Sequence, residues 1–179
     1  MTQNAGSRFL RIHAAFKAGD LDALRAAVDD PSVIPNGFID LAIGGCLEYA
    51  IYHSPVSFVR TLLEIDADPR PVDHIGFPPL IAALSCSRSQ PGSPARPDVM
   101  EILELLLVGG ADPHQRGVND YTALHMAVAE GNAPAVRLLL AHGADPALRT
   151  RIDECETPLE MAERAGLLVI ADLLRAPAR

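Results

Sequence analysis

One stretch of the chain, residues 120–146, contains two helix patterns together with the signals that start and stop them. Thr122 can cap a first short helix, in which Leu124 and its apolar neighbours share one face. Asn132 can cap a second, more apolar helix that ends at Gly143. The stretch is therefore expected to form a helical hairpin.

A single hairpin of this size cannot bury its own apolar faces, so repetition of the pattern decides the fold. The pattern does repeat. Its helix-opening leucines are separated by 33, 44 and 35 residues, at Leu47, Leu80, Leu124 and Leu159. The period is about 33 residues, and the long interval contains an insertion rich in Ser, Pro and Arg, residues 85–97. Lacking a periodic apolar stripe, the insertion is predicted to be a loop that folding does not require.

Two kinds of motif within this period identify a family. TALHMA at Thr122–Ala127 and TPLEMA at Thr157–Ala162 resemble the helix-opening motif of ankyrin repeats, and GADP at 110–113 and 143–146 resembles their closing turn. The corresponding positions at 45–48 and 78–81 lack the Thr and the His. The resemblance covers most of the chain and implies an all-α ankyrin-repeat solenoid of stacked helix-turn-helix units with finger-like turns.

The domain organisation follows from the same period. We expect one ankyrin-repeat domain over residues 1–179, because each repeat can bury its apolar face only against a neighbour. Its five units are predicted at residues 7–37, 38–72, 73–116, 117–149 and 150–179, with the insertion in the third. Within the third unit, Asp98 and Glu101 have the spacing of a capping box at the start of a second helix.

Charge and cysteine content limit the partners and the compartment. The formal net charge of −8 argues against nucleic acid and anionic membranes, which favour clustered Lys and Arg. A neutral or basic protein surface is the expected partner. The three cysteines lack metal-ligand or redox-pair spacing and are expected to be buried or half-buried thiols in a reducing compartment. Without an apolar run long enough to span a bilayer, the cytoplasm is the expected location.

No arrangement of residues in the sequence indicates catalysis or metal binding. His125 follows the helix-opening Thr-Ala-Leu, where its imidazole is expected to hydrogen-bond Thr122 and neighbouring turns. The other histidines are scattered among the units without the spacing of a helical zinc site. We therefore expect no enzyme activity, no cofactor and no metal.

The ankyrin resemblance places the binding surface on the finger tips and the exposed positions of the first helices, which line a concave groove. The finger-tip residues implied are His74, Ile75, Phe77, Val118, Asn119, Tyr121, Asp153, Glu154 and Glu156. The first-helix residues implied are Tyr52, His53, Ser85, Cys86, Ala129, Glu130 and Arg164. An apolar centre is typical of an interface, although Phe77 and Tyr121 could equally pack between neighbouring fingers.

Three functions are compatible with these observations. The chain could be a monomeric, non-catalytic module that binds a protein partner through the groove, which the resemblance favours. It could instead be a regulatory or inhibitory subunit of an enzyme, or a structural solenoid that associates with itself. Nothing in the sequence identifies the partner.

Overall fold

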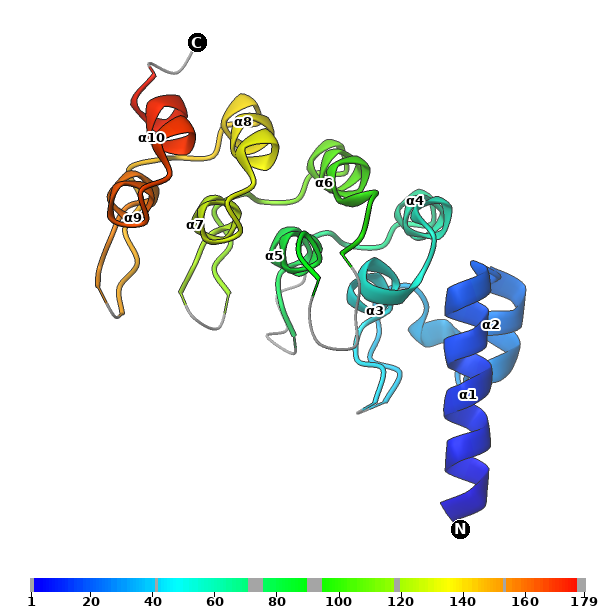
Figure 1. Cartoon of the computed structure of the whole chain (residues 1–179). Coiled ribbons are helices and arrows are strands. Elements are labelled where there is room, and N and C mark those ends of the chain that lie inside the picture. The colour runs from blue at the N-terminus through cyan, green and yellow to red at the C-terminus, as the bar shows by residue number, and fades with distance from the viewer. Residues whose placement is uncertain are drawn as a thin grey trace. The chain divides into compact units, whose positions relative to one another are not determined.

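Helices and turns make up all the regular structure in the part of the chain that the computed structural model describes, residues 2–40, 42–70, 76–89, 95–117, 120–152 and 154–176. Those ranges hold ten α-helices, one short 3-10 helix and a single isolated bridge between Phe38 and Gly45, but no strand (Figure 1). The expected all-α fold is confirmed. The chain divides into two compact units, an N-terminal unit of residues 1–79 and a C-terminal unit of residues 80–179.

The N-terminal unit contains two helix pairs. Its helices are α1 (Thr2–Ala18), α2 (Leu21–Ala27), α3 (Cys46–His53) and α4 (Val56–Glu64). Asp20 begins α2 by accepting a hydrogen bond from the Ala23 amide at 2.9 Å. The unit is held together by aromatic packing around the fully buried Phe16, whose ring centroid lies 4.8 Å from that of Tyr49 and 5.8 Å from that of Phe58.

The proline-rich segment after α2 is tied to the turn that follows α4. Its first part, Pro31–Val33, is the 3-10 helix. The Asn36 side chain then donates to the Asp66 carbonyl at 2.8 Å and accepts from the Asp68 amide at 2.7 Å. The segment thus satisfies backbone groups of the next turn without forming a strand, as expected from its two prolines.

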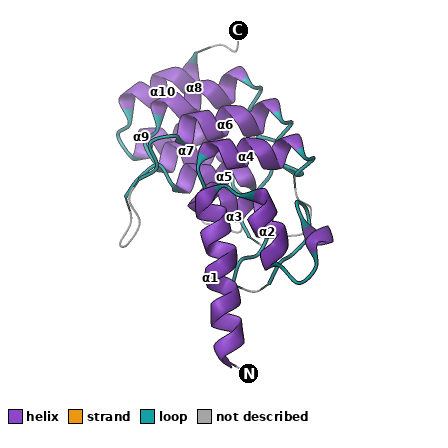
Figure 2. Ribbon diagram, turned by 90° about the vertical axis from the view of Figure 1, so that its right-hand side faces the viewer, coloured by secondary structure: helices purple, strands orange, loops and turns teal. Residues whose placement is uncertain are grey.

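The C-terminal unit contains three helix pairs. Their helices are α5 (Pro79–Ser85), which begins at the boundary between the units, α6 (Val99–Val108), α7 (Ala123–Ala129), α8 (Ala133–Ala141), α9 (Pro158–Arg164) and α10 (Leu168–Arg175). Figure 1 shows the first helices α5, α7 and α9 in one row and the second helices α6, α8 and α10 in another. The same second row is visible from the side in Figure 2. The finger turns before α7 and α9 leave the stack on the side of the first helices.

Side-chain caps explain where several of these helices begin. Asn132 accepts from the Ala135 amide at 3.0 Å, and Thr157 and Glu160 form a reciprocal capping box at the start of α9. The capping box predicted at Asp98 is wrong. Asp98 makes no side-chain cap, because its carboxylate binds the Arg96 guanidinium at 2.7 and 2.9 Å instead.

The apolar faces of the helices form the core of the C-terminal unit. Leu124, which sequence spacing placed on the apolar face of its helix, is fully buried, and so is Leu139 of α8. Other fully buried side chains of the unit are Ile102, Leu103, Leu106, Val128 and Val136. The helical register read from the sequence is therefore correct for α7 and α8.

Replacement of Leu139 by Ala should lower the free energy of unfolding by about 2 to 5 kcal/mol, because it leaves a cavity in a closely packed core. The measurement is chemical denaturation followed by circular dichroism. Leu168→Ala is the control, since Leu168 is 75% exposed and should change stability little. An unchanged denaturation midpoint for Leu139→Ala would contradict this packing.

The insertion joins α5 to α6, and its residues 90–94 lie outside the described part of the chain. Its first residues are attached to the end of α7. Arg88 donates to the backbone carbonyls of Glu130 and Ala129, both at 3.0 Å, and the Asn132 side chain donates to the Ser87 hydroxyl at 3.2 Å. This end of the insertion therefore packs against α7, because Arg88 satisfies carbonyls that the end of a helix leaves unpaired.

Arg88→Ala should reduce the free energy of unfolding by about 0.5 to 1.5 kcal/mol, the usual net contribution of intramolecular hydrogen bonds. Deletion of residues 87–97, closed by one glycine, should show a loss at least as large. Thermal unfolding of both variants tests this, with Arg137→Ala, an exposed arginine on α8, as the control. If Arg88→Ala unfolds as the parent does, the insertion contributes nothing at this contact.

Candidate functional site

Two finger turns of the C-terminal unit lie next to each other and have closed backbone geometry. In the finger before α7, the Gly117 amide donates to the Tyr121 carbonyl at 2.9 Å. In the finger before α9, the Thr150 amide donates to the Glu156 carbonyl at 3.0 Å. Asp120 and Cys155 have positive φ angles of 61° and 51°, which places the chain reversal at these two residues.

Asp120 links the two fingers. Although its side chain is only 8% exposed, it binds two arginines: Arg116 of its own finger at 2.8 Å and Arg151 of the next finger at 2.6 Å. The carboxylate also accepts from the Arg151 backbone amide. These hydrogen bonds, chiefly those from the Arg151 side chain, lower the pKa of Asp120 and keep it ionised.

A second set of charge pairs fixes the finger before α9 to its own helix. Arg149 binds the Glu160 carboxylate at 2.6 and 2.9 Å and donates to the Cys155 carbonyl at 2.8 Å. Arg116 in turn donates to the Arg149 carbonyl at 3.0 Å. Both fingers are thus held by paired charges, so the side chains between them have defined positions.

Asp120→Asn should destabilise the protein at neutral pH by removing one charge from the centre of this network. Asn also tolerates a positive φ, so the substitution changes the charge and keeps the turn. Since the folded pKa of Asp120 is lowered, its contribution is present above the unfolded pKa of about 3.9 and is lost as the pH falls through the folded pKa.

The measurement is the denaturant midpoint of parent and variant between pH 7 and pH 2. The difference between them should be largest at neutral pH and should shrink below pH 4. Asp172→Asn is the control, because the Asp172 side chain is 76% exposed. A difference that does not depend on pH would rule out the ionised carboxylate as the stabilising group.

His125 connects α7 to the finger before α9. Its Nδ1 lies 2.9 Å from the Thr122 hydroxyl and accepts from the Thr122 amide at 3.3 Å, while Nε2 lies 3.1 Å from the Glu156 carbonyl. Nε2 therefore carries the proton. Burial lowers the pKa of His125, which keeps the imidazole neutral. The structural role predicted for His125 is confirmed, because both ring nitrogens are occupied.

Glu48 occupies the equivalent position in α3 of the N-terminal unit, directly after the helix-opening leucine. Its carboxylate accepts from the Phe77 amide at 2.9 Å, which fixes the finger before α5. Gly76 has a φ of 109°, and a side chain there would collide with the Glu48 carboxylate. Burial raises the pKa of Glu48, against the opposing effect of the Phe77 hydrogen bond.

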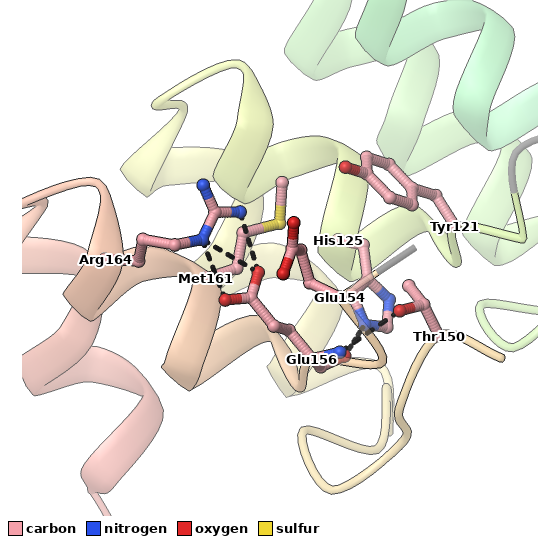
Figure 3. A pocket seen from close by; sticks show the side chains of 7 residues that line it. All are labelled: Tyr121, His125, Thr150, Glu154, Glu156, Met161 and Arg164. Atoms are coloured by element: carbon pink, nitrogen blue, oxygen red, sulfur yellow. Dashed lines mark hydrogen bonds and ion pairs between the residues drawn. The ribbon is translucent and has the colours of Figure 1, made fainter. Parts of the chain in front are cut away.

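A hollow lies between the two fingers of the C-terminal unit (Figure 3). The finger before α7 contributes Tyr121, whose ring stacks on that of His125 with centroids 5.7 Å apart. The remaining lining residues come from the next finger and from α9, and they are Thr150, Glu154, Glu156, Met161 and Arg164. The hollow therefore combines an aromatic side, an apolar side chain and ionised groups.

The ionised groups of the hollow leave one negative charge in excess. Arg164 binds the Glu156 carboxylate at 2.7 to 3.1 Å, which lowers the pKa of Glu156. Glu154 provides a second carboxylate near the same guanidinium, and Figure 3 shows it pointing into the space between Tyr121 and the Arg164–Glu156 pair. One cation thus faces two anions.

The structure brings some predicted binding residues together and leaves others apart. Tyr121, Glu154 and Glu156, with Arg164, share the hollow. Phe77 is 42% exposed in the N-terminal unit. Glu130 is half-buried and lies against Arg88 of the insertion. The predicted residues outside the described part of the chain are His74, Ile75, Val118, Asn119 and Asp153.

Tyr52 and His53 belong to an aromatic cluster of the N-terminal unit that sequence reasoning did not assemble. His53 lies with its ring centroid 4.4 Å from that of Tyr49 and 5.4 Å from that of His13. His13 Nδ1 is 2.8 Å from the Tyr49 hydroxyl. The spacing of Tyr49 and His53 by four residues on one helix could have indicated their contact, but His13 lies on α1 and requires the fold.

The hollow also includes residues that the sequence did not assign to binding. His125 was expected only to stabilise the helix-opening motif, and no pattern in the sequence indicated that Thr150 or Met161 would lie at a binding surface. Another expectation fails nearby: Cys155 is exposed at the finger tip rather than buried or half-buried. Cys155 lies in the turn of the finger before α9, where its φ is positive.

Comparison with known proteins agrees with this geometry. Residues 95–178 match the family described as ankyrin repeats, in three copies. The matched segment contains α6 to α10, both closed fingers and the hollow between them. The segment of residues 95–178 therefore consists of ankyrin repeats.

Several named proteins align with part of the chain. A protein named as an E3 ubiquitin-protein ligase, XBOS34 of Oryza sativa subsp. japonica, is 37% identical over 73 residues, which are 40% of this chain and 14% of the relative. The ligase-named XBAT34 of Arabidopsis thaliana is 30% identical over 118 residues, 65% of this chain and 28% of the relative. A protein of Treponema pallidum (strain Nichols), named as ankyrin repeat-containing, is 45% identical over 51 residues, 28% of this chain and 17% of the relative. The chain thus spans less than a third of each of these proteins.

Among the helices of the described residues, none is long and apolar enough to cross a membrane.

Proposed function

We propose that the chain is a non-catalytic module that binds a protein partner through its finger turns and the exposed side of its first helices. Ankyrin repeats are generally protein-interaction modules, which is the class of function that the family supports. The observation that carries the proposal is the hollow between two fixed fingers, with the half-buried Tyr121 ring along one side. Aromatic residues held in such positions are frequent anchors of binding energy.

The chemistry of the hollow also favours binding over catalysis. A general base needs an imidazole or carboxylate with a free acceptor and a pKa near neutrality. His125 has both nitrogens occupied and a lowered pKa, and the pKa of Glu156 is lowered by Arg164. The ankyrin family is generally non-catalytic, and the alignments with ligase-named proteins cover short parts of those chains. A regulatory subunit of an enzyme is the alternative role, and it would use the same recognition surface.

The double variant Phe77→Ser and Tyr121→Ser should weaken partner binding strongly and leave the helical circular dichroism unchanged. A central aromatic anchor often contributes about 2 kcal/mol or more, so each single variant should lose part of the affinity. The measurement is capture of the partner by immobilised parent and variants, followed by titration of the captured protein. Measuring each single variant separates the contribution of the N-terminal finger from that of the C-terminal finger.

Arg137→Ser is the control, because Arg137 is exposed on the second helix α8 and should not contact a partner held at the fingers. Retention of full affinity by the double variant would place recognition on another face or on the insertion. A mass in solution that rises with concentration would support the self-associating alternative.

A further inference from the structure

The hollow of the C-terminal unit has a charge and a set of lining residues that select among possible partner groups. Arg164 is the cation among its lining residues, and it is bound to Glu156. Glu154 forms no ion pair with another described residue, and it is exposed. A partner group entering between Tyr121 and this pair would therefore meet an excess of negative charge.

Three properties of the lining fit a long basic side chain. Met161 and the Tyr121 ring offer apolar contact to the methylene groups of such a side chain. The ring can also attract a cation. Glu154 and the remaining acceptor positions of Glu156 can receive its N–H groups at the end of the hollow. A carboxylate or phosphate would be repelled by both glutamates, and a purely apolar group would remove them from water without compensation.

We propose that the hollow binds a lysine or arginine side chain presented by an extended segment of the partner. The proposal rests on the proposed function and adds the chemistry of the group that is recognised. The negative net charge of the whole chain is of the sign that would draw such a segment to the surface. The fixed fingers then add specificity, because Asp120 and His125 hold both sides of the hollow in place before binding.

The test is selection of random peptides displayed on phage against the immobilised full chain. Lysine or arginine should be enriched at one position of the selected peptides, and the enrichment should be absent when the same library is selected on Glu154→Gln. Peptides that are enriched without a basic residue, or equally on both proteins, would overturn the inference and leave the proposed function standing. Failure to select any peptide would count against the proposed function itself.

A double-mutant cycle then assigns the contact. For a selected peptide, replacing its lysine by norleucine, which keeps the methylene chain and removes the charge, should weaken binding to the parent about threefold to tenfold. The same replacement should have a smaller effect on binding to Glu154→Gln or to Tyr121→Leu, because each variant removes one of the groups that contact the charge. Circular dichroism of both variants checks that they remain folded.

Glu104→Gln is the matched control, since it removes one negative charge from an exposed position on the second helix α6 of the same unit. In this variant, the norleucine replacement should weaken peptide binding as much as it does in the parent. If the norleucine replacement weakens peptide binding equally little in Glu104→Gln and in Glu154→Gln, then overall charge, rather than the hollow, attracts the basic residue.

Discussion

The contact on which the fingers depend is made by one residue of a first helix, the residue directly after the helix-opening leucine. In α7 this is His125, which offers an N–H to the Glu156 carbonyl 31 positions further along the chain. In α3 it is Glu48, which accepts from the Phe77 amide 29 positions further along. Hydrogen-bond polarity is reversed between the two, but each satisfies a backbone group of the next finger. Repeat proteins are stabilised mainly by such contacts between neighbours.

The two side chains make this contact at different electrostatic cost. His125 makes it as a neutral imidazole, so its buried position holds no charge. Glu48 makes it as a carboxylate whose burial opposes ionisation. The collision that a side chain at Gly76 would make with Glu48 shows how closely the finger approaches this group. The positive φ at Gly76 favours glycine there, and a side chain at this position would in addition displace the Glu48 carboxylate from the Phe77 amide.

The local parts of this structure could be predicted from the sequence, whereas its long-range polar contacts could not. The leucine period and the Asn132 and Thr157 caps depend on residues within a few positions of one another, so helices α7 to α10 were accessible to pattern reasoning. Asp120 binds a residue 31 positions away, and nothing in the letters of either finger signals that pairing. Asp98 shows that local spacing can also mislead. Its carboxylate binds the Arg96 guanidinium and does not cap the helix amide that the sequence spacing indicated.

In the candidate site, the exposure of the predicted binding residues could be learned only from the structure. Phe77, Tyr121 and Glu156 all lie three positions before a helix-opening leucine, and the sequence treats them alike. In the folded chain Phe77 is 42% exposed, Tyr121 is stacked on His125, and Glu156 is bound by Arg164.

The difference among these equivalent residues follows from their neighbours. The finger charges Arg116, Arg149 and Arg151 are engaged in holding the backbone. Under the proposed function, recognition therefore falls to Glu154 and Tyr121 rather than to these arginines. Because those groups lie on fixed fingers, a partner needs to order little of this surface on binding. Affinity should then depend on what the partner presents to Glu154 and Tyr121, since the frame around them is complete before the partner arrives.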